Sequence, residues 1–407
     1  AGTALTTGDN NVAVGFEALS TEDAEGSSTA VGYRALKAQN ASATPHNTAV
    51  GQDAGTAVTT GKFNTFLGSL AGDAINTGNS NVALGYKALT ADTKGDNSVA
   101  IGDQALATQN FTSSTDSYNV AIGSSAGQNL TTAQYSAIIG AQAGDALTTG
   151  ERNTVVGYDA LGAEVAGNYN VAVGMQALRS QTNSSGTDTR NTAVGYQAGY
   201  NLSTGKQNTL LGSNVASGDT ITGDDNTCVG YAAGHALTSG DNNLFLGHDA
   251  GRTGSPGGNF TTHDNRIVLG DENIVEFNAQ VSLSVASDER DKTDFTALDI
   301  GLDFVKQLNP LTYRWDKRSK YGDKYADDYD LNAQTPDGTH KEEQLEVGFK
   351  AQEVNALEEA SGYKIADKTN LTTNLSDDGK QYGMQYEKFV PILVKAIQEL
   401  SAKNDAL

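Results

Sequence analysis

The first 270 residues repeat one short pattern, which leaves few folds open to them. The pattern Asn-x-Ala-(Val/Ile/Leu)-Gly recurs fifteen times; nine of the fourteen spacings between its glycines are 17 residues, and the others are 18 to 23. A fixed minimum length with insertions into one connector is typical of a solenoid, in which each coil stacks on the next. The repeat glycines are Gly15, Gly32, Gly51, Gly68, Gly85, Gly102, Gly123, Gly140, Gly157, Gly174, Gly195, Gly212, Gly230, Gly247 and Gly270.

Each repeat has the residues of a short strand. In Asn81-Val82-Ala83-Leu84-Gly85 the apolar residues are spaced for a strand, and the glycine permits a bend that a Cβ would obstruct. The asparagines recur in register, so their amides are expected to form ladders along the stack. Cys228 takes the alanine position of its repeat, where a small buried hydrophobe is expected. The repeat predicts a mostly β chain with a parallel β-roll or solenoid shaft over residues 1–270.

A single coil of this kind has a thin core. It offers a few Ala, Val and Leu side chains against the entropy lost on ordering about seventeen residues. We therefore expect the shaft to associate laterally, most simply as a homotrimer. The pattern resembles the head of trimeric autotransporter adhesins, a stacked β-roll with coils of the type Asn-(Ser/Thr)-(Ala/Val)-Ile-Gly, although those coils are usually shorter. Residues 1–8 nearly repeat residues 143–150, so we expect further sequence upstream.

The charge and composition argue against several kinds of partner. The chain has 27 Lys and Arg against 49 Asp and Glu, a net charge of −22, which disfavours nucleic acid and anionic membranes. No stretch approaches the ~20 apolar residues of a membrane span, so we expect no membrane insertion. One cysteine and five scattered histidines lack the spacing of metal ligands, and we expect no metal or cofactor. Asp-Asn pairs such as Asp9-Asn10 favour turns over calcium sites.

The repeat ends at a segment of strict alternation. Between residues 275 and 285, apolar Val, Phe, Ala and Leu alternate with Glu, Asn, Gln and Ser. Such a pattern predicts a strand with one apolar face. We interpret residues 271–286 as a β neck, in which the same segments of three chains would pair.

Residues 287–407 have a different composition and predict an α+β domain. Charged residues number 36 in the first 286 positions and 40 in the last 121. The patterns predict a helix at 298–308 ended by Asn309-Pro310, a strand at 311–315, a charged loop at 316–344, renewed order at 347–354, and a long closing helix from about Glu387 with Pro391 in its first turn.

The closing helix has the spacing of an oligomeric bundle. Tyr386, Leu393 and Leu400 lie seven residues apart, and Phe389 and Ile397 fill in between them. This heptad spacing predicts a trimer helix. The alternative is an amphipathic helix that packs within its own domain.

Ser287 and Lys292 place a hydroxyl and an amine five positions apart, where the composition changes. A serine and a lysine can form a nucleophile and its general base. Solvated surface residues are the alternative interpretation.

The ordered motifs of this domain strongly resemble the intramolecular chaperone of phage endosialidases and tail fibres. They are Ser-Asp-x-Arg-x-Lys at 287–292, Leu-x-Pro at 308–310, Tyr-x-Trp at 313–315, Gly-Phe-x-Ala-Gln-Glu-Val at 348–354, and the run from Tyr386 to Leu400. The resemblance implies a domain that trimerises, guides folding of the upstream fibre and then releases itself by cleavage before the motif serine.

The resemblance also implies roles for individual residues. The scissile bond would join Ala286 to Ser287, with Ser287 as the nucleophile and Lys292 as the general base. Burial in a trimer would lower the pKa of the lysine and so make it basic. Many family members have an apolar residue before the lysine, whereas this chain has Asp291, whose charge would favour the protonated amine. The supporting residues would be Asp288, Arg290, Gln352 and Glu353.

These observations together predict a phage tail fibre. It would be a virion component assembled in the host cytoplasm, held to other tail proteins through upstream sequence, and would attach to a glycan or protein receptor on the host. Its only catalysis would be a single-turnover serine-lysine autoproteolysis, with no external substrate. The alternatives are a trimeric surface adhesin and a glycan-degrading tailspike, the latter requiring a cleft with paired carboxylates.

Overall fold

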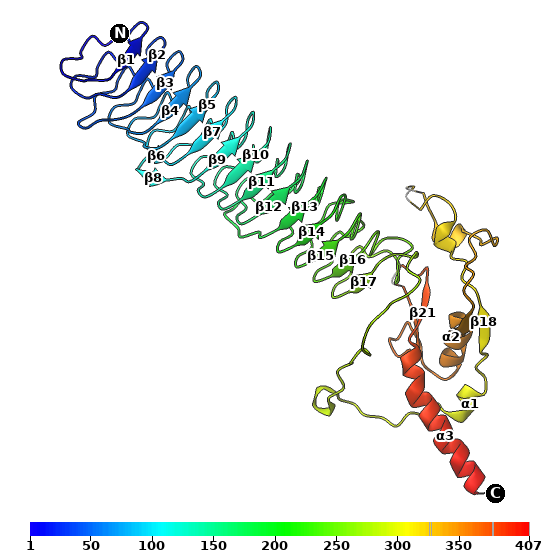
Figure 1. The fold of residues 1–407 in the computed structure, drawn as a ribbon. Helices are drawn as coiled ribbons and strands as arrows, with labels where there is room; N and C mark the ends of the chain where they lie inside the picture. The colour runs from blue at the N-terminus through cyan, green and yellow to red at the C-terminus, as the bar shows by residue number, and fades with distance from the viewer. Residues whose placement is uncertain (325, 327, 377, 407) are drawn as a thin grey trace. The chain divides into compact units, whose positions relative to one another are not determined.

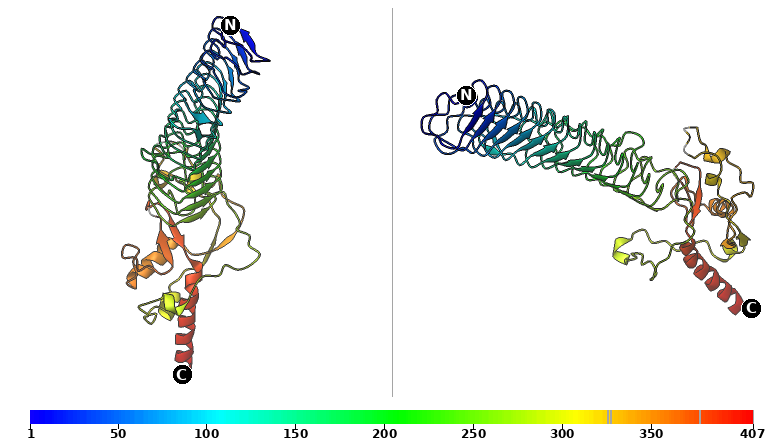
Figure 2. Two further views of the ribbon diagram at one scale, coloured as in Figure 1. Left: turned by 90° about the vertical axis from the view of Figure 1, so that its left-hand side faces the viewer. Right: turned by 45° about the horizontal axis from the view of Figure 1, so that its top comes forward.

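The computed structural model describes residues 1–324, 326, 328–376 and 378–406, which form two compact units. The first, here called the shaft unit, comprises Ala1–Ala250 and Phe260–Leu269. The second, the C-terminal unit, comprises Gly251–Asn259 and Gly270–Leu407. Figures 1 and 2 show the shaft unit as a stack of similar coils.

The shaft unit is built on one parallel sheet of fifteen strands, each of three residues, which follow one another in sequence order (Figure 1). This confirms the predicted mostly β solenoid. A further parallel pair, β6 (Gly95–Asp96) and β8 (Thr115–Asp116), lies in the connectors that precede β7 and β9. The sheet strands are β1 (Val12–Val14), β2 (Thr29–Val31), β3 (Thr48–Val50), β4 (Thr65–Leu67), β5 (Val82–Leu84), β7 (Val99–Ile101), β9 (Val120–Ile122), β10 (Ala137–Ile139), β11 (Thr154–Val156), β12 (Val171–Val173), β13 (Thr192–Val194), β14 (Thr209–Leu211), β15 (Thr227–Val229), β16 (Leu244–Leu246) and β17 (Ile267–Leu269).

The glycine after each strand brings neighbouring coils close together. Gly123 follows β9 with φ +137°, a conformation that residues with a Cβ rarely adopt. A Cβ built on Gly123 would lie 2.5 Å from both the carbonyl carbon and oxygen of Gly140 in the next coil. The repeat therefore needs glycine here for its backbone conformation and for close approach between coils.

The asparagine ladder forms in register, but its amides bond mainly to backbone groups. The Oδ1 atom of Asn64 accepts a hydrogen bond from the backbone N–H of Asn81 at 2.9 Å, and its Nδ2 donates to the carbonyl of Gly78 at 2.9 Å. Both partners lie in the next coil. Because the side chain is fully buried, these bonds supply partners that water cannot reach.

The interior of the shaft is filled by the middle residue of each strand and by apolar residues from the turns. Most middle residues are alanine, and from β2 onward all are buried. Phe66 and Phe245 take the same position in two coils and are also fully buried. Cys228 is buried as predicted, and burial raises the pKa of its thiol to about 12.

Three polar layers, four coils apart, interrupt this apolar interior. Glu22, Asp92 and Glu164 occupy equivalent places seven residues after a repeat glycine, and all three are fully buried. In the following coil, Gln39, Gln109 or Gln181 donates an amide hydrogen bond to the carboxylate, at 3.0, 2.7 and 2.7 Å respectively. The two coils between successive polar layers carry Val58 and Ile75, or Leu130 and Leu147, at the same place.

Glu164 has the fullest set of hydrogen-bond donors in these layers. Its Oε1 accepts from the backbone N–H groups of residues 165, 166, 167 and 183 at 3.0, 3.1, 2.7 and 3.1 Å. Its Oε2 accepts from the side chains of Gln181 at 2.7 Å and Asn183 at 3.0 Å. In the equivalent layer, burial raises the pKa of Asp92, and the hydrogen bond from Gln109 opposes this shift.

The C-terminal unit combines short helices with two small antiparallel sheets, β18 with β19 and β20 with β21. Its core contains Ile300, Phe304, Val354, Phe389 and Ile392. Among the residues that the structure describes, none of the helices has the length and hydrophobicity needed to span a lipid bilayer. The elements are η1 (Glu289–Asp291), α1 (Leu302–Val305), β18 (Leu311–Tyr313), η2 (Arg318–Lys320), η3 (Leu331–Ala333), β19 (Glu346–Gly348), α2 (Ala351–Ala360), β20 (Thr373–Leu375), β21 (Tyr382–Met384), η4 (Tyr386–Lys388) and α3 (Phe389–Asp405).

The helix predicted at 298–308 is wrong in its length, because α1 comprises only Leu302–Val305. Gly301, the residue before it, has φ −156° and ψ −120°, which are not helical angles. The first helical N–H, that of Leu302, is capped by the carboxylate of Glu399 in α3 at 2.8 Å. Upstream of the helix, the Tyr363 hydroxyl donates a hydrogen bond to Asp299. The closing helix is confirmed, with Pro391 in its first turn.

The predicted strand of the neck is not formed within the single chain. Residues 275–285 form no strand pairing, bend at Gln280 and Val281, and expose their apolar side chains. Val275 is 78% exposed and Leu283 is 91% exposed. A strand requires hydrogen bonds to a neighbouring strand, and this segment has none along its own chain.

Candidate functional site

The chain reverses direction between Ser287 and Lys292 through a short 3-10 turn. Asp288 caps η1, because its Oδ1 accepts a hydrogen bond from the backbone N–H of Arg290 at 2.9 Å. The N–H of Lys292 then donates to the carbonyl of Glu289 at 3.2 Å. This turn brings the side chain of Lys292 back to Ser287.

The two predicted catalytic side chains are in contact. The Nζ atom of Lys292 lies 2.5 Å from the Oγ of Ser287 and donates a second, longer hydrogen bond of 3.3 Å to the carbonyl of the same residue. In this arrangement a protonated lysine donates to the hydroxyl, whereas a neutral lysine would accept its proton. Both residues are exposed in the single chain.

Asp288 and Arg290 form a bidentate ion pair beside this contact. The Nε and Nη2 atoms of Arg290 donate to the two carboxylate oxygens of Asp288 at 3.0 and 2.6 Å. These hydrogen bonds lower the pKa of Asp288 and raise that of Arg290. The pair therefore remains charged over the whole physiological pH range, and its planar geometry holds the turn that carries Ser287 and Lys292.

Asp291, Gln352 and Glu353 are not joined to this pair. Within the described residues, the carboxylate of Asp291 forms no ion pair with Lys292. Gln352 and Glu353 lie exposed in the first turn of α2, where Glu353 pairs with Lys350 at 2.7 Å and this contact lowers its pKa. Figure 1 shows the segment around η1, in yellow-green, apart from α2.

The predicted trimer helix has two apolar faces. Phe389, Ile392 and Ala396 are buried against the core of the same chain. Leu393, Ile397 and Leu400 are exposed, with 67% of Ile397 open to solvent. Of the five predicted residues, Phe389 thus packs within its own unit, and Tyr386 is half-exposed, its hydroxyl accepting the N–H of Phe349 at 3.2 Å. The helix α3 therefore packs within its own domain on one face and leaves a second apolar face uncovered.

Sequence reasoning missed Glu358, a fully buried carboxylate that joins α2 to β20. Its Oε1 accepts from the N–H and the hydroxyl of Thr372, each at 2.6 Å, and its Oε2 accepts from the hydroxyl of Thr373 at 2.6 Å. The available signal was an acidic residue four positions after the apolar Val354, which places both on the same face of a helix.

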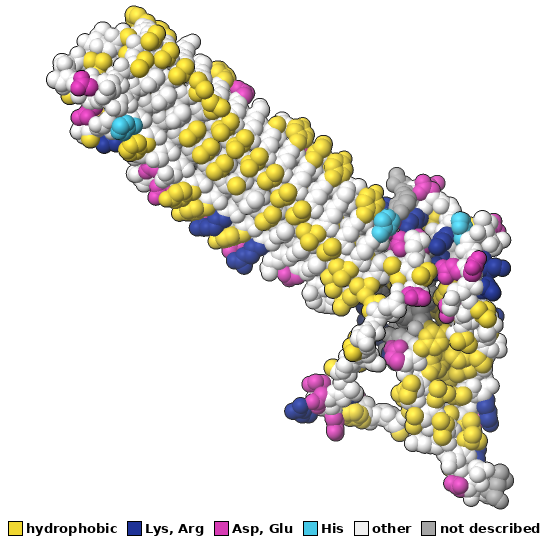
Figure 3. Space-filling view, in the orientation of Figure 1, with side chains coloured by type: hydrophobic (Ala, Val, Ile, Leu, Met, Phe, Trp, Pro, Cys, Tyr) yellow, Lys and Arg dark blue, Asp and Glu magenta, His cyan; other side chains and the backbone are white. Residues whose placement is uncertain are grey.

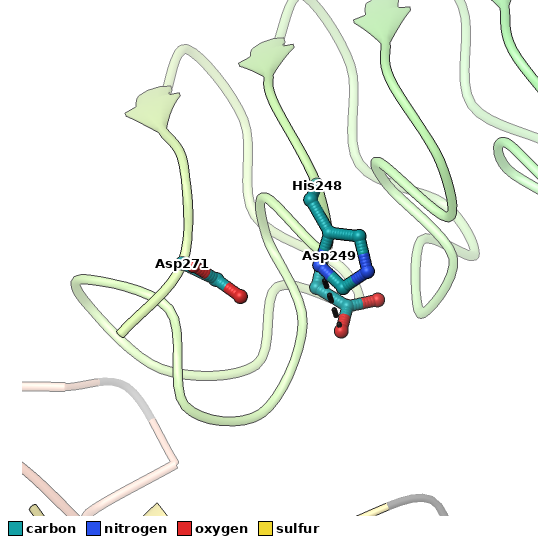
Figure 4. A group of neighbouring side chains, drawn as sticks. All are labelled: His248, Asp249 and Asp271. Atoms are coloured by element: carbon teal, nitrogen blue, oxygen red, sulfur yellow. Dashed lines mark ion pairs between the residues drawn. The ribbon is translucent and has the colours of Figure 1, made fainter. Parts of the chain in front are cut away.

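His248 and Asp249 follow β16 and form an ion pair, with 3.4 Å between Nδ1 and Oδ2 (Figure 4). Asp271, which the figure also shows, belongs to the C-terminal unit. We infer no metal site from these three residues.

Residues 287–363 match the model of the family described as Chaperone of endosialidase. The match begins at Ser287 and includes four of the five ordered motifs, ending before α3. No curated protein and no solved structure matches the chain. A chaperone segment of this family behind a β-solenoid indicates a protein of the tail-fibre or tailspike type.

Proposed function

We propose that the chain is a homotrimeric phage tail-fibre protein for host attachment, carried on the virion after assembly in the host cytoplasm. Its residues 287–407 would gather three copies, guide the folding of the shaft and then leave by cleavage of the Ala286–Ser287 bond. The observation that carries this proposal is the 2.5 Å contact between Lys292 Nζ and Ser287 Oγ at the first residue of the matched chaperone segment.

The cleavage would follow from the chemistry of these two groups. Neutral Lys292 would take the proton from Ser287 Oγ, which would attack the carbonyl carbon of Ala286. The C–N bond would break as the amine of Ser287 takes up a proton, leaving an ester to the serine oxygen. Water would then hydrolyse the ester, freeing the carboxylate of Ala286 and the hydroxyl of Ser287.

This mechanism depends on assembly because it needs a neutral lysine. An exposed lysine is protonated at neutral pH, since its unperturbed pKa is about 10.4. Burial of Lys292 between chains would disfavour the charged form and lower this pKa. Cleavage would therefore wait until the trimer has formed, with Asp288 and Arg290 holding the turn.

Trimerisation is supported by two apolar surfaces that the single chain leaves uncovered. The first is the exposed side of α3, with Leu393, Ile397 and Leu400. The second is the alternating segment 275–285, whose backbone and apolar side chains lack partners in the chain itself. Three parallel copies would pair the segments as strands and bundle the helices.

Mass spectrometry of the purified full chain tests the cleavage. We expect the wild type to yield residues 287–407 as a separate fragment, and the Ser287→Ala variant to keep its intact mass, because the nucleophilic oxygen is gone. Ser284→Ala, at an exposed serine three residues upstream, is the matched control and should cleave like the wild type. If the wild type kept its intact mass, or if Ser287→Ala released the same fragment, the autoproteolysis would be rejected.

Sedimentation tests the role of the α3 surface. Ile397→Glu is expected to lower the fraction of trimer, because it places three carboxylates in an apolar contact. Gln398→Glu adds the same charge at the neighbouring exposed position and should leave the trimer intact. A fully trimeric Ile397→Glu variant would show that this side of α3 is not between chains.

A further inference from the structure

The outer side of the shaft sheet is an unbroken uncharged surface, here called the outward strand face. It consists of the first and third residues of each of the fifteen strands from β1 to β17, leaving out β6 and β8. The third residue is Val, Ile or Leu in every strand, and the first is Val, Thr, Ala, Leu or Ile. None of these residues is buried. Figure 3 shows hydrophobic side chains, in yellow, in rows along the coils.

Charged residues are kept away from this face, although the chain has a net charge of −22. In the shaft they lie in the turns and connectors on either side of the strands: Arg152 precedes β11, while Asp159 and Arg179, which follow β11 and β12, form an ion pair at 2.5 Å. Two chains of the same strong charge repel one another unless they meet where charges are absent. Contiguous apolar surfaces of this extent are also unusual on proteins that remain single. The outward strand face is thus the part of the shaft at which a like-charged chain can approach.

The repeat itself indicates what covers this face. Its rows recur once per coil, with successive strands aligned residue to residue, for example Val120 with Ala137 and Ile122 with Ile139. A globular partner would cover a few coils. A second copy, parallel and in register, presents the same rows at the same spacing along the whole shaft, so each row meets its equivalent.

We propose that the outward strand face is the lateral contact between copies of this chain, in parallel register from β1 to β17. This inference rests on the proposed homotrimer and specifies which side of the shaft the three chains share. It places Thr, Val, Ile and Leu side chains between the chains and leaves the turns and longer connectors on the outside, open to a receptor.

Chemical cross-linking of the full chain tests this contact. Cys228→Ala removes the single native thiol and restores the alanine common at that position. In this background, Ala137→Cys places a thiol on the outward strand face, in β10. Asn129→Cys places a thiol at an exposed position in the turns before that strand and is the matched control. A short bis-maleimide reagent is added to both variants, and sedimentation records the number of chains.

We expect trimers in both cases, with Ala137→Cys shifting to linked chains on a denaturing gel and Asn129→Cys staying single. If trimers became linked through residue 129, or through neither residue, the outward strand face would not be the contact between chains, although the proposed homotrimer would remain. Monomers in sedimentation would overturn the homotrimer, and the shared face with it.

Discussion

Replacing Gly123 with alanine is expected to destabilise the middle of the shaft by about 3 kcal/mol or more, one of the two largest effects that we predict. The new Cβ would lie 2.5 Å from the carbonyl carbon and oxygen of Gly140 and 2.9 Å from the backbone nitrogen of Ala141. All three are main-chain atoms that cannot turn aside. Overpacking of this kind costs about 1–3 kcal/mol, and the left-handed φ of +137° adds about 1–3 kcal/mol of strain for a residue with a Cβ.

The thermal melting midpoint and amide hydrogen exchange measure this effect. Exchange should quicken first in the coils on either side of residue 123. Gly186→Ala is the control, since a Cβ at Gly186 meets nothing within 4 Å, and it should change the stability by no more than about 0.5 kcal/mol. If Gly123→Ala had the same melting midpoint as Gly186→Ala, the stack would not require the close approach between coils.

The second large effect is expected from Glu164→Leu. The substitution removes the acceptor of six hydrogen bonds in a place from which solvent is fully excluded. Each buried donor left without a partner costs about 1–3 kcal/mol, and local relaxation recovers part of the sum. We therefore expect a loss of about 4 kcal/mol or more, although Leu147 occupies the same place one coil earlier.

Two variants separate the hydrogen bonds from the charge of Glu164. Glu164→Gln keeps the acceptor for the four backbone N–H groups but turns an amide toward Gln181 and Asn183, so its melting midpoint should fall between wild type and Glu164→Leu. Glu151→Gln changes the same charge at an exposed pair with Arg152 and should be nearly neutral. A Glu164→Leu protein as stable as the wild type would mean that the polar layer contributes nothing to the fold.

The shaft could be predicted from the sequence because a short, repeated sequence pattern determines its structure. A glycine every 17 residues or slightly more fixed the coil, and the apolar pattern between glycines fixed which residue of each strand points inward. The role of the asparagines could be predicted only in part. Their register follows from the repeat, but their bonding to the backbone N–H and carbonyl of the next coil depends on how the coils stack.

The turn at 287–292 could also be located from the sequence, since a serine and a lysine at that spacing are local to one another. The structure places the Lys292 Nζ and the Ser287 Oγ 2.5 Å apart. Gln352 and Glu353 are more than fifty positions away, so their relation to Ser287 depends on tertiary packing that no local pattern encodes. The same holds for α1, whose start is set by Glu399 from the far end of the domain.

The closing helix shows why sequence patterns alone gave two answers. Its apolar residues cover more of the helix surface than a single packing contact would bury. The sequence is therefore compatible both with a bundle between chains and with packing inside the domain. The structure assigns Phe389, Ile392 and Ala396 to the core of its own unit and leaves Leu393, Ile397 and Leu400 outside it. Which of these residues join the core depends on where α1 and α2 lie, and the heptad spacing gives no information on that.

Nearly identical coils carry a risk of error, because a chain could omit one coil, loop it out and still stack alanine on alanine. The carboxylate layers at Glu22, Asp92 and Glu164 oppose this error. Leaving out the coil of Gln39, Gln109 or Gln181 would set a charged group directly against valine or leucine, without its amide donor. A stack that skips a coil at one of these layers is therefore less stable than the correct one. The buried acids thus favour the correct alignment of the coils during folding, and they stabilise the stack once it has formed.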